Sequence, residues 1–100
     1  MKKGYRSEYL AKQKLCDIFG KQNVIKVAIG GAQDFIVLQK GRVVKFVEVK
    51  ECHKNKFSAS ARERTQFDRI KDMALEHGCS FELWIHYPHK RDWSTLTFYG

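Results

Sequence analysis

The sequence predicts an α/β domain in which two helices pack on a mixed, mostly five-stranded β-sheet. Two segments carry apolar residues at helical spacing, and several short segments rich in Val, Ile and Phe are typical of strands. These segments follow one another in the order α, β, β, β, α, β, β, which favours a mixed sheet with helices packed on it. With 100 residues, of which 43% are hydrophobic, the chain fits one domain over residues 1–100.

The first half of the chain contains one expected helix and three expected strands. Gly20 follows the first periodic segment and is expected to end it. In chain order we expect a helix over 5–19, a strand over 23–29, a flexible loop at 30–32, and strands over 34–39 and 42–51.

The second half opens on a polar loop and continues into the second helix. Ser60 and Glu63 have the spacing of a capping box, in which the serine accepts from the first helical turn and the glutamate reaches back. The helix is expected to continue to about His77, with Gly78 as its C-terminal cap. Two further strands are expected over 81–87 and 94–99.

The charge of the chain is strongly basic. Nineteen Lys and Arg residues face eleven Asp and Glu residues, for a net charge of +8. An excess of this size on a small domain indicates a polyanionic partner, usually nucleic acid. The alternative is that the charge serves solubility or belongs to a thermophilic surface.

Several features indicate the cytoplasm and argue against a membrane. The three cysteines are odd in number and scattered, which fits free thiols in a reducing compartment. No apolar run of about 18 residues exists, so no span is expected, and the basic start lacks the apolar core of a signal peptide. With a nucleic-acid partner, the expected place of the protein is the nucleoid or a site of viral replication.

Glu8 occupies an unusual place on the first expected helix. At about 100° per residue it shares a face with Ala11, Leu15 and Phe19, near the centre of the apolar stripe. Because an unpaired buried carboxylate is costly, we expect a cation or a hydrogen-bond donor beside it. A buried salt bridge without any catalytic role would also explain its position.

A carboxylate and an ammonium group also interrupt the most apolar strand. Side chains alternate along a strand, so Val44, Phe46, Glu48 and Lys50 are expected on one face. The opposite face is then expected to carry Val43, Lys45, Val47 and Val49.

The turn between the two central strands decides where Asp34 lies. A two-residue Lys-Gly loop would put Asp34 and Glu48 on opposite faces of the sheet. A three-residue loop of residues 39–41 would pair Asp34 with Phe46 and place it diagonal to Glu48, on the face of Lys50. Lys-Gly is a poor type I′ pair, whereas a type I turn followed by a left-handed glycine is common. We therefore expect the three-residue loop and a shared face.

Two carboxylates a few ångströms apart repel each other by about 1 kcal/mol in water, and by more in a cleft. A divalent cation removes that cost, and carboxylates with water suit Mg²⁺, for which Mn²⁺ is expected to substitute. A lysine beside such a site can stabilise phosphoryl charge or help to activate a water. In a basic protein, this combination points to metal-assisted phosphodiester hydrolysis.

The same residues carry a resemblance to a known family. Asp34 followed by Glu48-Val49-Lys50 at a spacing of 14 resembles the PD-(D/E)xK nuclease superfamily. The segments GYRSEYLAKQKL, with Glu8, and SARERTQFDRI, with Gln66, extend the similarity. Within the superfamily the chain is most similar to the archaeal-type Holliday junction resolvases.

The resemblance implies a restriction-endonuclease-like core and a role for each matching residue. It implies a metal held by Asp34 and Glu48, with the backbone carbonyl of Val49 as a third ligand and Glu8 supporting the metal site. Lys50 would be the catalytic lysine, and Gln66 would order the site from the second helix. The implied catalytic set is therefore Glu8, Asp34, Glu48, Lys50 and Gln66.

The DNA contacts are expected from basic clusters close to these residues in the sequence. Lys26 occupies a place where the resolvases carry a basic residue toward DNA. The loop 53–64 follows the catalytic strand directly, and contacts to phosphate fix position without reading sequence. The alternative for each cluster is a solvated face. The candidates are Lys2, Lys3, Arg6, Lys26, Lys54, Lys56, Arg62 and Arg64.

The expected function is that of an Mg²⁺-dependent crossover junction endonuclease, which nicks four-way DNA junctions in symmetric pairs. A junction needs two paired cuts, so a homodimer with two equivalent sites is expected. Three alternatives remain open: a small VRR-NUC-type nuclease acting on flaps or other structured DNA, a non-catalytic DNA-binding module, and a purely structural use of the acidic residues.

Overall fold

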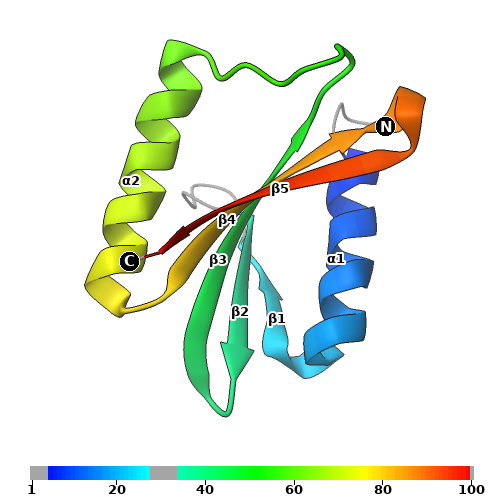
Figure 1. Ribbon diagram of the computed structural model, residues 1–100. Coiled ribbons are helices and arrows are strands. Elements are labelled where there is room, and N and C mark those ends of the chain that lie inside the picture. The colour runs from blue at the N-terminus through cyan, green and yellow to red at the C-terminus, as the bar shows by residue number, and fades with distance from the viewer. Residues whose placement is uncertain (1–4, 28–33, 100) are drawn as a thin grey trace.

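The computed structural model describes residues 5–27 and 34–99, which form three layers with a β-sheet between two helices (Figure 1). Two short 3-10 turns, η1 (Lys21–Asn23) and η2 (Pro88–Lys90), connect longer elements. The helices and strands, in chain order, are α1 (Tyr5–Phe19), β1 (Val24–Lys26), β2 (Phe35–Gln39), β3 (Arg42–Glu51), α2 (Ala61–His77), β4 (Ser80–Tyr87) and β5 (Asp92–Tyr99).

The sheet is mixed and five-stranded, with the strands in the order β1-β2-β3-β4-β5. Among the strands of the described residues, three neighbouring pairs are antiparallel, and β3 and β4 run parallel. A parallel pair needs a long crossover, and α2 provides it. The predicted fold class is therefore confirmed, including the sheet type and the two flanking helices.

The two helices cover opposite faces of the sheet, because successive strand residues point to opposite sides (Figure 1). On one face α1 packs Ala11 and Leu15 against a core formed by Phe35, Val37, Val47, Val49 and Trp84. On the other face α2 packs Phe67, Ile70 and Ala74 against Phe46, Phe81, Leu83 and Ile85.

The ends of α2 follow from the sequence alone. The Ser60 hydroxyl accepts from the Glu63 N–H at 3.1 Å, and the Glu63 carboxylate accepts from the Ser60 N–H at 3.0 Å. Gly78 ends the helix in the left-handed conformation, with φ of 67°. The predicted capping box and C-terminal cap are both confirmed.

The turn between β2 and β3 differs from the prediction. Gln39 pairs with Arg42, so the loop has two residues, and Lys40 and Gly41 have φ of 52° and 76°. Positive φ at both central positions is the type I′ turn, which matches the twist of the flanking strands. The expectation of a three-residue loop was wrong, because the pairing of the strands outweighed the poor preference of Lys for this turn.

A β-bulge then restores the relation between Asp34 and Glu48 that the turn alone would have lost. Leu38 pairs with Val43 but Val37 pairs with Lys45, which leaves one extra residue in β3 at Val44. Beyond the bulge Phe35 pairs with Val47, so Asp34 comes directly opposite Glu48 rather than opposite Phe46. The predicted shared face is correct, although the predicted reason for it is not.

The bulge also corrects the expected alternation at the start of β3. Val43 packs with the core under α2, on the face of Phe46, whereas Val44 packs with the core under α1. The expectation had these two residues the other way round, because an extra residue reverses the side-chain pattern on one side of the bulge.

Other boundaries agree to within a few residues. The strand expected over 23–29 is observed as Val24–Lys26, and the loop expected at 30–32 lies outside the described residues. All three cysteines are free thiols, as expected. No helix in the described part of the chain is long and apolar enough to cross a membrane.

The turn leads to the first testable prediction. Replacing Lys40 by Asn, the residue that type I′ turns favour before Gly, should raise the free energy of unfolding by about 0.5–1 kcal/mol. Gly41→Ala should lower it by about 1–2 kcal/mol, since an added Cβ meets nothing within 4 Å and only the left-handed backbone resists it. Urea unfolding followed by tryptophan fluorescence measures both changes. A neutral Gly41→Ala would contradict this turn type.

Candidate active site

The predicted acidic residues line one hollow of about 250 Å³ at the end of β3. The first turn of α1 borders it on one side, and the chain entering β2 borders it on the other. Its lining residues are Ser7, Glu8, Asp34, Glu48, Val49, Lys50 and Glu51.

Asp34 is held by the backbone of the neighbouring strand. Its own N–H donates to the carbonyl of Val47 at 3.1 Å, and its side-chain Oδ2 accepts from the N–H of Val49 at 2.8 Å. These two bonds extend the β2–β3 contact to the residue before the start of β2, and they fix the Asp34 carboxylate beside that of Glu48. The start of β2 and the end of β3 therefore bring two acidic groups together.

Glu48 is a buried carboxyl group with incomplete hydrogen bonding. Only 3% of the residue is exposed, and its Oε1 is buried with no hydrogen-bond partner. Burial and then the negative charge of Asp34 raise its pKa from 4.5 to about 8, against the opposing pull of Lys50. Burial also raises the pKa of Asp34. A proton or a cation between the two groups is what this environment favours.

Lys50 follows Glu48 by two residues on β3, so its side chain lies on the same face and lines the same hollow. Its Nζ lies 3.4 Å from Glu48 Oε2 and 3.3 Å from Gln66 Oε1. The amide of Gln66 in turn donates to Glu48 Oε2 at 2.8 Å. Gln66 thus bridges Lys50 and Glu48 from α2.

Glu8 lies at the edge of the buried face of α1 rather than at its centre. The centre is formed by Ser7, Ala11 and Leu15, all essentially buried, while the Glu8 side chain is 32% exposed. The expectation that Glu8 lies near the centre of the apolar stripe was therefore wrong. The expected cation is present, since Lys26 Nζ lies 2.6 Å from Glu8 Oε2.

Sequence reasoning missed a polar network beside the acidic pair. The Ser7 hydroxyl donates to Glu51 Oε1 at 2.6 Å and lies 2.7 Å from His86 Nδ1. Since Ser7 has one proton and gives it to Glu51, His86 is the donor in the second bond. Hydrogen bonding from Ser7 lowers the pKa of Glu51, and burial lowers that of His86, whose ring stacks on Trp93. No spacing in the sequence singles out these residues.

The donor set fits a hydrated, hard cation better than a fully enclosed metal. Within residues 5–27 and 34–99, no three His, Cys, Asp or Glu side chains converge to hold an ion by themselves. Mg²⁺ commonly binds through one or two carboxylates and keeps several waters. The pair of Asp34 and Glu48, with one Glu48 oxygen unsatisfied, has this character.

The basic residues expected at DNA differ in their surroundings. Lys26 is half-exposed and paired with Glu8, and Lys2 and Lys3 lie outside the described residues. The remaining candidates are exposed, in the first turns of α1 and α2 and in the loop after β3: Arg6, Lys54, Lys56, Arg62 and Arg64.

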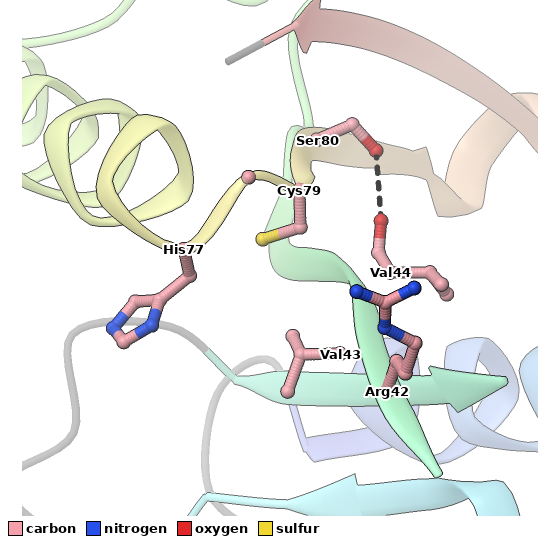
Figure 2. A pocket seen from close by; sticks show the side chains of 7 residues that line it. Arg42, Val43, Val44, His77, Cys79 and Ser80 are labelled. Carbon is pink, nitrogen blue, oxygen red and sulfur yellow. Dashed lines mark hydrogen bonds between the residues drawn. The ribbon is translucent and has the colours of Figure 1, made fainter. Parts of the chain in front are cut away.

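A second hollow, of about 510 Å³, lies at the other end of β3 and is unlike the first (Figure 2). Its lining includes Arg42, His77 and Cys79 but no carboxylate. Ser80 Oγ, on its rim, donates to the carbonyl of Val44 at 3.4 Å. The lining residues of this hollow include no acidic side chain to hold a hard cation, so the acidic hollow is the candidate active site.

The raised pKa of Glu48 predicts how stability depends on pH when metal is removed. Between pH 4.5 and about 8 the folded protein holds a proton on Glu48 that the unfolded chain has released. The stabilisation is therefore complete below pH 4.5 and is lost as the pH rises to about 8. Glu48→Gln should lose much less stability over this range. Urea unfolding of both proteins in EDTA at pH 5 and pH 8 measures the difference, and parallel pH dependences would contradict the prediction.

Comparison with known proteins places the fold. No protein-family model matches the chain, and no curated protein sequence matches it significantly. Among solved structures, the chain is similar to Hjc from Archaeoglobus fulgidus, a Holliday junction resolvase from an archaeal hyperthermophile. The match has a TM-score of 0.55 and 20% sequence identity, and it covers 84% of this chain and 73% of that one. This chain therefore shares its α/β fold with that protein.

Proposed function

We propose that the protein is a metal-dependent, structure-selective DNA endonuclease of the PD-(D/E)xK type that resolves Holliday junctions by paired symmetric nicks. The observation that carries the proposal is the buried pair of Asp34 and Glu48, beside Lys50. A pair of mutually repelling carboxylates is costly to maintain in a small domain, and a cation-dependent reaction explains it. The shared fold with a junction resolvase supports the choice of substrate.

Asp34 and Glu48 are the residues that would hold the ion, with the carbonyl of Val49 as a third ligand and Glu8 in support. Mg²⁺, or Mn²⁺ in its place, would neutralise charge on the scissile phosphate and lower the pKa of an attacking water. The unsatisfied Oε1 of Glu48 supports this assignment, because a buried acceptor without a donor favours a cation.

The chain's own side chains would orient the phosphate and hold one another in position. The Lys50 ammonium group, on the rim of the hollow, can donate a hydrogen bond to a phosphate oxygen as charge builds up on it. Gln66 restrains both Lys50 and Glu48, so that neither side chain has to reorganise during the reaction. The N–H of Val49 donates to the carboxylate of Asp34 and fixes its orientation.

The DNA would approach along the exposed basic side chains that flank the hollow. The loop after β3 and the first turn of α2 contribute Lys54, Lys56, Arg62 and Arg64, and Lys26 lies beside Glu8 on the other side. Such contacts bind phosphates without reading sequence, as selection of a branched shape requires. A homodimer would present two equivalent sites to the two strands that are cut, in the cytoplasm where the DNA lies.

Metal binding tests directly whether Asp34 and Glu48 hold a divalent ion. Calorimetric titration with Mg²⁺ or Mn²⁺ should show binding that Asp34→Asn and Glu48→Gln each remove. Because Glu48 holds a proton near neutral pH, binding should release protons, so the measured heat should change with the ionisation enthalpy of the buffer. Glu76→Gln, an exposed change on α2, is the matched control and should bind as the unmodified protein does. Equal binding by Glu48→Gln would overturn the metal assignment.

Cleavage of a panel of fixed four-way junctions, flaps and linear duplexes with Mg²⁺ tests the substrate. We expect two symmetric nicks in the junction, and a loss of at least about 100-fold in rate for Glu48→Gln and for Lys50→Ala. Binding of the junction by both variants should stay nearly intact, because the exposed basic side chains of the loop after β3 and of α2 are unchanged. Preferential cutting of flaps would instead favour a VRR-NUC-type nuclease, and binding without any cutting would favour a DNA-binding module.

A further inference from the structure

We propose that Glu63 has a second role beyond capping α2: it is a positioning residue that holds the ammonium group of Lys50 in the site. The structural part of this proposal concerns a contact between two side chains. Its consequence for catalysis rests on the proposed nuclease function.

The two oxygens of Glu63 have different partners. Oε1 accepts from the backbone N–H of Ser60 at 3.0 Å, which completes the capping box. Oε2 lies 3.6 Å from the Nζ of Lys50. Both charged side chains are partly buried, with 28% of Glu63 and 24% of Lys50 exposed, so water screens their attraction less than it would at an open surface. One carboxylate therefore joins the start of α2 to the catalytic strand.

Lys50 has one other carboxylate within ion-pair distance among the residues that the structure describes, and this is Glu48 at 3.4 Å. Glu48, however, is expected to share its charge with a cation. A divalent ion at Asp34 and Glu48 would repel the ammonium group and weaken this attraction. Glu63 lies outside the acidic pair and would keep its full charge for Lys50.

The geometry of α2 makes this support rigid. Glu63, Gln66 and Phe67 stand at i, i+3 and i+4 and therefore share one face of the helix. Lys50 Nζ lies 3.3 Å from the amide oxygen of Gln66 and 5.9 Å from the ring centroid of Phe67. Because α2 packs on the sheet through Phe67, Ile70 and Ala74, this packing fixes the place from which the three side chains reach Lys50.

Two substitutions separate capping from positioning. Glutamine at the third helical position also completes a capping box, so Glu63→Gln keeps the cap and removes only the charge near Lys50. Ser60→Ala removes the hydroxyl that accepts from the Glu63 N–H but leaves the Glu63 carboxylate in place. Ser60→Ala should therefore lower the urea midpoint more than Glu63→Gln does.

The first measurement needs neither metal nor DNA. The lysines are reductively methylated with ¹³C-formaldehyde, which keeps their charge, and the Lys50 signal is assigned by its loss in Lys50→Arg. We expect the NMR signal of Lys50 to shift in Glu63→Gln and to stay in place in Ser60→Ala. An unshifted Lys50 signal in Glu63→Gln would overturn the proposal.

The second measurement is the single-turnover rate of junction cleavage with saturating Mg²⁺. Glu63→Gln should cut about 10–100-fold more slowly, since a small misplacement of a catalytic group is costly, and should bind the junction within about twofold of the unmodified protein. Ser60→Ala should cut within about threefold. An equal loss of rate in both variants would reduce Glu63 to a helix cap and overturn the positioning role. If the unmodified protein cuts no DNA, the proposed function fails, while a Lys50 shift in Glu63→Gln alone still upholds the contact.

Discussion

The juxtaposition of Asp34 and Glu48 across the β2–β3 pair is the constraint on which the rest of the candidate site depends. Burial raises the pKa of both carboxyl groups, and the negative charge of Asp34 raises that of Glu48 further, so the pair favours a proton or a cation. The neighbouring contacts follow from this pair. Val49 donates to Asp34, Gln66 donates to Glu48, and Lys50 lies against the same oxygen.

The topology of the sheet explains why these partners come from distant parts of the chain. β3 and β4 are parallel, so the chain must cross over one face between them, and α2 makes that crossing. The loop after β3 leads into the capped start of α2, whose first turns carry Glu63 and Gln66 to Lys50. On the opposite face α1 brings Ser7 and Glu8 to the rim of the hollow. The end of β3 is thus enclosed by two helices that pack on separate cores.

Much of the fold could be predicted from the sequence because the decisive signals are local. Both ends of α2 could be predicted from local signals, namely the capping box at Ser60 and Glu63 and the C-terminal cap at Gly78. The apolar periodicity between them predicted the helix itself. The spacing of Asp34, Glu48 and Lys50 identified the candidate site. The turn at Lys40 and Gly41 could not be predicted correctly, since the preference of one lysine is worth less than the pairing of two strands. Nothing in the sequence marked the bulge that compensates for it.

The sequence by itself determined the order of the elements, the ends of α2 and which charged residues interrupt apolar segments. Only the tertiary structure decided how those charges are paired. It turned Glu8 toward Lys26 at the edge of α1, set Asp34 opposite Glu48 through a bulge, and gave the capping residue Glu63 a second partner in Lys50. The physical reason is that the hydrogen bonds of a helix end form between residues close in the sequence, so local sequence determines them. Ion pairs between elements depend instead on strand register and helix rotation, which the packing of the whole domain sets.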